Sequence, residues 1–454
     1  MRAPDRGRPP VPGPIRSFDF PPVESRALEN GLGLRVARMP RLPVVSVNLV
    51  LTAGEAGLDD GRAGLAALAG DALEGGTEAR SGLELARDLE GIGARLGAST
   101  GWDATTVHLS CLADRLSEGM GLLAEVVRRP SFPSLEVERT RDQCLARIRQ
   151  RRMDPSGLAA DEAARLIYAD GVPYGRPLAG TEASVAPADR AAVRGLADAY
   201  YRPGGGGLVV VGDLDPGEVR ERVEGHFADW VGDPPTRPDV DARPRSRERT
   251  VHVVHREGSV QSEIRIGHPG APKTTPDYFP LLVANTVLGG AFTSRLNLNL
   301  REEHGFTYGV RSRFSFRRGA GPFSVSAAVG TDVTADAVRE VVNELEGLVE
   351  DGPTEEETRA ARDYIAGVFP LRLETTGQVA ARVAELVVYG LPDDWHATYR
   401  DRVRAVEADS ATEAVRRHIR PGEAQIVVVG DADAVTAPLE ALGLGTVIIH
   451  EGEG

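Results

Sequence analysis

The 454-residue sequence is poor in several residue types that would indicate particular functions. Lys273 is the only lysine among its 53 basic residues, and aromatic residues make up 5% of the chain. The two cysteines, Cys111 and Cys144, do not have the spacing of metal ligands, so we expect free, buried thiols. No stretch approaches the roughly 18 apolar residues that a membrane-spanning helix needs, so we predict no membrane span.

The chain also lacks an excess of positive charge. It carries 67 acidic residues against 53 basic ones, a formal net charge of −14. This balance argues against a nucleic-acid partner, because phosphate binding needs a basic patch. Residues 1–16 contain five prolines and four arginines but no apolar run. We expect a flexible arm there rather than a signal peptide, and a cytoplasmic protein.

One sequence pattern occurs twice along the chain. Residues 202–213 read Arg-Pro-Gly and then, after three glycines and a leucine, Val-Val-Val-Gly-Asp. Residues 420–431 repeat Arg-Pro-Gly and Val-Val-Val-Gly-Asp at the same spacing, 218 residues later. Each copy predicts a loop that leads into a buried strand, with a helix before and after it. Two homologous α+β domains follow from this repeat.

The periodicity of apolar residues predicts further helices and strands around the repeats. The predicted helices are 62–73, 83–92, 116–127, 135–151, 183–201, 278–288, 334–349, 355–368, 377–389 and 402–418. The predicted strands are 33–37, 44–51, 94–100, 105–112, 250–254, 261–267, 306–316 and 323–329. We therefore divide the chain into an arm (1–16), an N-terminal domain (17–231), a Pro-rich linker (232–249) and a C-terminal domain (250–450).

The stretch from Leu288 to Val310 is the most informative part of the chain. Two glycines, Gly289 and Gly290, interrupt an apolar run before a short predicted helix, and a strand is expected from Phe306. Arg301 lies near the helix end and Tyr308 early in the strand, so both could point to one spot. A forked cation and a phenolic hydroxyl suit a peptide carbonyl or its developing oxyanion.

The same stretch contains Leu-Gly-Gly, Ser-Arg-Leu and Leu-Arg-Glu-Glu-His-Gly-Phe-Thr-Tyr-Gly-Val. It resembles the C-terminal half of the pitrilysin-type peptidases, the inverted-zincin enzymes that include the mitochondrial processing peptidases. The resemblance implies two domains of the processing-peptidase/LuxS-like metallohydrolase type, each a mostly antiparallel sheet packed with helices. It also implies that Arg301 and Tyr308 help to hold the scissile peptide group, with Gly289 and Gly290 as substrate-binding positions.

Members of that family bind zinc through His-x-x-Glu-His, in which two histidines ligate the metal and the glutamate activates water. Aligned on Gly64-Leu65-Ala66 and Gly76-Thr77, these three positions are occupied here by Ala67, Gly70 and Asp71. The third ligand, a glutamate 76 residues further on, is replaced by Arg147. We therefore predict a degenerate zinc site without metal, in which Asp71 and Arg147 form an ion pair.

Three functions are compatible with this pattern. The first is a non-catalytic subunit that binds an extended peptide and completes the active site of a homologous zinc-bearing partner in a heterodimer. Zinc is then expected in the partner and no cofactor in this chain. The alternative is a purely structural protein resembling the core subunits of respiratory complexes. A lone enzyme with an unusual metal site is the third, and the missing general base argues against it.

Overall fold

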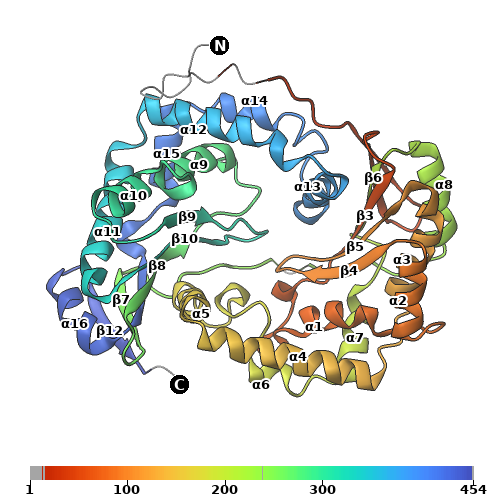
Figure 1. Cartoon of the computed structure of the whole chain (residues 1–454), viewed down its shortest axis with the longest axis horizontal. Helices are drawn as coiled ribbons and strands as arrows, with labels where there is room; N and C mark the ends of the chain where they lie inside the picture. The colour runs from red at the N-terminus through yellow and green to blue at the C-terminus, as the bar shows by residue number, and fades with distance from the viewer. Residues whose placement is uncertain (1–12, 14–15, 238, 452–454) are drawn as a thin grey trace, which may run out of the picture.

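The computed structural model describes residue 13, residues 16–237 and residues 239–451, and most of the predicted arm (1–16) lies outside these ranges. Two six-stranded, mostly antiparallel sheets organise the chain (Figure 1). The first has the order β1-β2-β6-β3-β5-β4 and the second the order β12-β7-β11-β8-β10-β9. The α+β fold predicted from the sequence is confirmed.

The first sheet is built from β1 (Val23–Ala27), β2 (Gly33–Arg38), β3 (Val44–Leu51), β4 (Arg95–Thr100), β5 (Thr105–Leu112) and β6 (Gly207–Gly212). The second contains β7 (Thr250–His255), β8 (Gln261–Pro269), β9 (Val310–Phe314), β10 (Pro322–Gly330), β11 (Gln425–Gly430) and β12 (Thr446–His450). The two Val-Val-Val repeats form the buried central strands β6 and β11. The sheets differ at one edge, because β1 pairs antiparallel to β2 whereas β12 pairs parallel to β7.

Helices surround both sheets. Those of the first half are α1 (Leu65–Asp71), α2 (Gly82–Gly91), α3 (Leu116–Arg128), α4 (Ser134–Met153), α5 (Pro155–Ile167), α6 (Glu182–Val185), α7 (Arg190–Tyr200) and α8 (Pro216–Phe227). Those of the second half are α9 (Tyr278–Asn285), α10 (Arg295–Asn297), α11 (Thr334–Asp351), α12 (Glu355–Val368), α13 (Thr376–Tyr389), α14 (Tyr399–Arg404), α15 (Ala408–His418) and α16 (Ala432–Ala441). Between Phe227 and Thr250 no helix or strand is found in the described residues, and the predicted domain boundaries stay a prediction.

Several predicted elements are wrong in their extent. The predicted helix 62–73 is split into 3-10 turns around a short α1, and the predicted helices 183–201 and 402–418 are each divided in two. The sequence analysis missed α5, β1 and β12 altogether. Helix α5 has mostly small side chains, but its buried residues Ala159, Ala163, Leu166 and Ile167 recur at helical spacing, and its Asp154-Pro155 start is a known helix signal.

The two halves exchange one helix each (Figure 1). Helix α13 of the second half packs on β3 and β6 of the first sheet, and α5 of the first half packs on β8 and β11 of the second. On α13, Val379 and Val383 are fully buried in one apolar cluster with Val209 and Val211 of β6. Because each sheet obtains part of its cover from the other half, neither half buries its apolar surface alone.

A hairpin tip of the second half also locks into the first. Arg317 lies between two aromatic rings, with its Cζ 4.4 Å from the Trp102 ring centroid and 4.3 Å from that of Tyr174. Asp103 accepts hydrogen bonds from the Arg318 backbone N–H (3.1 Å) and the Tyr174 hydroxyl (3.3 Å). Burial raises the pKa of Asp103, and these donors oppose the rise. The Tyr-Gly-Arg-Pro loop that begins at Tyr174 therefore joins the two halves.

The exchange predicts how fragments of the chain behave. If the chain is cut within residues 232–249, neither half should unfold cooperatively by itself. The first half would lack α13 on its sheet, and the second half would lack α5. Coexpressed fragments should associate and regain one transition. Circular dichroism during heating and size-exclusion chromatography test this expectation. A fragment that alone unfolds at the temperature of the intact chain would contradict it.

Candidate functional site

The positions aligned with a zinc motif lie on α1 and α4. Helix α1 carries Ala67, Gly70 and Asp71, and Arg147 lies on the long helix α4. Arg147 Nη2 donates to Asp71 Oδ2 at 2.5 Å, so the ion pair predicted from the sequence is confirmed. The same nitrogen lies 2.9 Å from Cys144 Sγ, and this thiol is buried and free, as is Cys111.

The ion pair between Asp71 and Arg147 adds little stability. The Arg147 and Asp71 side chains are 62% and 35% exposed, and exposed pairs contribute about 0–1 kcal/mol. An arginine at the position of a third ligand would repel Zn²⁺ rather than bind it. The pair is therefore a polar contact between two helices.

The position aligned with the general base is closed by packing. A Cβ atom added to Gly70 would lie 2.7 Å from Thr100 Oγ1, closer than real side chains approach. The Thr100 hydroxyl is fixed there, because it bonds to the Ala66 carbonyl at 3.2 Å and to Thr105 Oγ1 at 2.9 Å. Any side chain at position 70 would have to displace the threonine on β4.

Glu55, which the sequence analysis did not single out, holds the start of α1. Its carboxylate is 1% exposed and accepts hydrogen bonds from the backbone N–H groups of Gly64 and Ala67, both at 2.9 Å. Burial raises the pKa of Glu55, and these two backbone donors oppose the rise. A carboxylate at a helix N-terminus is favourable, so Glu55 stabilises the helix rather than offering a ligand.

The residues of this site do not fit a zinc ion. Ala67 and Gly70 have no donor atoms, Gly70 is sealed by Thr100, and Asp71 is engaged by Arg147. Across residues 16–237 and 239–451, no group of three or more His, Cys, Asp or Glu side chains is arranged to hold a metal.

Arg301 and Tyr308 lie between α10 and β9. Arg301 is on a π-helical turn, Leu298–Glu303, that continues α10. The predicted strand from Phe306 is wrong at its start, because β9 begins at Val310 and Tyr308 precedes it in a loop. The buried Asn297 side chain explains this late start, since it donates to the Val310 carbonyl at 2.9 Å and accepts from its N–H at 3.2 Å.

The loop leaves the Tyr308 side chain exposed. It is 98% exposed, whereas Val310 and Ser312, the next residues of the same parity, are buried. Thr307 Oγ1 donates to the Ala328 carbonyl at 2.8 Å and so fixes the backbone beside Tyr308. The phenolic hydroxyl is therefore presented to solvent from an anchored loop.

Two arginines of this stretch have different surroundings. Arg295 donates to both carboxylate oxygens of Glu357, each at 2.6 Å, and to the Gly352 carbonyl at 3.0 Å. Arg301 makes one hydrogen bond within the described residues, to Glu302 at 2.6 Å. Its Cζ lies 4.3 Å from the centroid of the Phe292 ring. Arg295 thus fastens the loop to α12, and most N–H donors of Arg301 are available.

The two glycines of the stretch have a packing role. Gly289 is buried, and an added Cβ would lie 2.5 Å from the Ser312 backbone nitrogen of β9. At Gly290 an added Cβ would lie 3.0 Å from the Asn285 side chain and carbonyl. Both glycines let the loop approach its neighbours closely. Their contact with a peptide stays a prediction.

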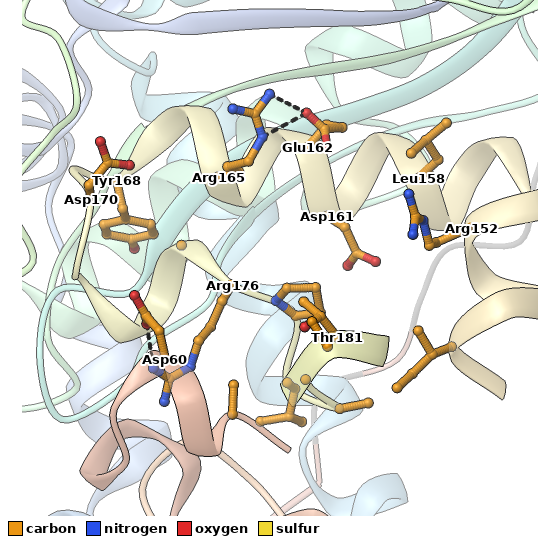
Figure 2. A pocket seen from close by; sticks show the side chains of 18 of the residues that line it. Asp60, Arg152, Leu158, Asp161, Glu162, Arg165, Tyr168, Asp170, Arg176 and Thr181 are labelled. Atoms are coloured by element: carbon orange, nitrogen blue, oxygen red, sulfur yellow. Dashed lines mark hydrogen bonds and ion pairs between the residues drawn. The ribbon is translucent and has the colours of Figure 1, made fainter. Parts of the chain in front are cut away.

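A pocket of about 1370 Å³ lies elsewhere, beside α5 (Figure 2). None of the predicted site residues lines it. Its charged groups pair with one another, Arg165 with Glu162 at 2.5 Å and Arg176 with Asp60 at 2.8 Å, as Figure 2 shows. Because cations and carboxylates alternate on its walls, the pocket does not favour a ligand of one charge.

Known families match both halves of the chain. Residues 36–182 match the family described as insulinase (peptidase family M16), and residues 187–365 match the peptidase M16 inactive domain. These ranges together span most of the sequence, and they contain the degenerate α1 site and the Arg301–Tyr308 stretch respectively. The chain belongs to the pitrilysin-type M16 peptidase family.

Several bacterial proteins are similar over most of their length. An uncharacterized zinc protease of Mycobacterium tuberculosis is 28% identical over 394 residues, which cover 85% of this chain and 89% of that protein. One of Streptomyces coelicolor is 26% identical over 317 residues, covering 68% of both chains. These relatives are named as zinc proteases, whereas the printed sequence of this chain contains no His-x-x-Glu-His segment.

Solved structures share the fold. A peptidase M16 inactive domain from Pseudomonas fluorescens superposes with a TM-score of 0.84 at 23% identity, covering 90% of this chain and 98% of that one. A protease from Helicobacter pylori gives the same TM-score at 19% identity, covering 90% of this chain and 100% of that one.

In the described part of this chain, no helix has the length and apolar character to cross a membrane.

Proposed function

We propose that this chain is the non-catalytic, substrate-binding subunit of a two-chain zinc peptidase. Its partner would be a homologous chain that carries the zinc motif, and its substrate an extended peptide. Zinc and its bound water would come from the partner. Arg301 and Tyr308 of this chain would complete the active site by donating hydrogen bonds to the scissile carbonyl.

The observation that carries this proposal is the contrast between the two sites. At the degenerate zinc site, Asp71 is paired with Arg147 and Gly70 is packed against Thr100. At the second site, Tyr308 is exposed and the donors of Arg301 are largely unused, although the surrounding loop is tightly fixed. A structural protein would have no need for an anchored loop that presents an exposed tyrosine beside an arginine with mostly unused donors.

The peptide has a suitable place to bind. Strand β4 is an edge strand of the first sheet. An extended peptide can add to such an edge through main-chain hydrogen bonds. Strand β9 is an edge strand of the second sheet, but the Asn297 amide already binds both backbone groups of Val310 and Asn285 binds the Ser312 carbonyl, so β9 does not offer the same free edge.

Reconstitution tests the proposal. The tagged chain is coexpressed with a homologue from the same organism that contains His-x-x-Glu-His, and the two are purified together. Each chain alone and the complex are then assayed on a fluorogenic peptide library, with and without a zinc chelator. We expect chelator-sensitive cleavage by the complex only. Full activity of the homologue alone, unchanged on adding this chain, would instead support the structural alternative.

A further inference from the structure

Phe292 is a second exposed aromatic residue at the proposed site. Its side chain is 67% exposed and lies in the loop that follows Gly290. The Arg301 guanidinium lies over its ring, with Cζ 4.3 Å from the ring centroid. Such a cation–π contact is worth about 0.5–1 kcal/mol at an exposed site and more when water is excluded.

The backbone beside Phe292 is fixed by the residue that also fixes β9. Asn297 Nδ2 donates to the Ala291 carbonyl at 3.2 Å and to the Val310 carbonyl at 2.9 Å. Ser294 N–H donates to the same Ala291 carbonyl at 3.2 Å. The buried Asn297 amide therefore sets the loop that carries Phe292 relative to the strand that follows Tyr308.

An aromatic ring and a carboxylate hold an arginine side chain in different ways. Arg295 is held by three hydrogen bonds, which use its N–H donors. The Phe292 ring contacts one side of the Arg301 guanidinium and uses none of them. Stacking on an aromatic ring leaves the in-plane N–H groups free to bind a carbonyl. This arrangement suits an arginine that must be ordered before the substrate arrives.

We propose that Phe292 is a positioning residue that orients Arg301 toward the scissile carbonyl. The proposal rests on the function proposed above. Phe292 itself donates no hydrogen bond to substrate and acts through the arginine. The short Glu302 contact holds one N–H of the same guanidinium, so the ring and the carboxylate together define its direction.

A double-mutant cycle in the reconstituted complex tests this role. Phe292→Leu is expected to lower kcat/KM about three- to tenfold, because it removes the ring but keeps an apolar side chain. Phe292→Tyr should retain nearly full activity. In the Arg301→Ala background, Phe292→Leu should cause no further loss. Equal losses in both backgrounds, or a Phe292→Tyr loss as large as that of Phe292→Leu, would overturn the proposal.

A measurement on the free chain separates this proposal from the function on which it rests. The Arg301 Nε–H signal is assigned in a ¹⁵N-arginine spectrum by its disappearance in Arg301→Ala. The ring current of Phe292 should shift it, and Phe292→Leu should move it toward the position of an unstacked arginine. An unmoved signal would overturn the positioning role. If the signal moves while Arg301→Ala leaves the complex fully active, the proposed function fails and the contact stands.

Discussion

Tyr308→Phe is expected to lower the turnover of the assembled two-chain enzyme by about 100- to 1,000-fold, without preventing assembly. Loss of one donor to a developing oxyanion typically costs this much, about 3–4 kcal/mol. The change removes only a hydroxyl from a side chain that is 98% exposed, so neither packing nor folding should suffer. Steady-state kinetics on complexes shown to be intact by size-exclusion chromatography measure the effect.

Arg301 offers the same test with a different donor. Arg301→Ala should reduce turnover by a similar factor, and Arg301→Lys should fail substantially, because a point charge does not replace a planar fork. Two matched controls lie on α12: Tyr364→Phe, at a tyrosine that is 46% exposed, and Arg359→Ala, at an arginine that is 67% exposed. Both controls should leave turnover unchanged. Full turnover in all three site variants would leave this chain as a scaffold only.

The purified chain is expected to contain no stoichiometric zinc and to hydrolyse no peptide by itself. The positions of the metal ligands and base are Ala67, Gly70, Asp71 and Arg147, and three protein ligands plus water are the usual catalytic set. Metal analysis by mass spectrometry and a peptidase assay with the single chain check this directly. One tightly held zinc ion per chain, with activity lost on chelation, would be incompatible with the proposed role.

Restoring the site should also fail. Ala67→His or Asp71→His supplies one ligand without the others, and Asp71→His also removes the ion pair with Arg147. Gly70→Glu should lower the unfolding temperature, because its Cβ would lie 2.7 Å from the hydroxyl of Thr100. Ala67→Ser, on the half-buried side of α1, is a conservative control. Zinc-dependent turnover in any single-site variant would show that the alignment is wrong.

Family membership alone would not distinguish this chain from its zinc-dependent relatives. The residues by which we propose to distinguish this chain from those relatives are few, and they lie on one face of α1 and in the loop before β9. On α1, Ala67 and Gly70 have no donor atoms and the helix is packed against Thr100 of β4. In the loop before β9, Tyr308 is exposed and Arg301 makes one hydrogen bond within the described residues, to Glu302. The proposal that the partner chain supplies zinc while this chain supplies Arg301 and Tyr308 rests on this difference between the halves.

The sequence by itself determined the repeated architecture, and it predicted the two candidate sites. The two Val-Val-Val-Gly-Asp segments became β6 and β11, because continuous β-branched runs favour strands that are buried on both faces. The identities of Ala67 and Gly70, which have no donor atoms, predicted without any structure that no zinc ion is held there. The Asp71–Arg147 pair could also be predicted, since it needs only helix alignment and opposite charge.

Only the tertiary structure decided how the halves depend on each other and how the second site is built. Helix α5 belongs to the first half in sequence, so its role as a cover for the other half's sheet appears only in packing. Tyr308 has the strand parity of Val310, but the Asn297 amide occupies the Val310 backbone groups and keeps the tyrosine in a loop. The contact of Phe292 with Arg301 depends on the path of the chain between them, which local periodicity does not specify.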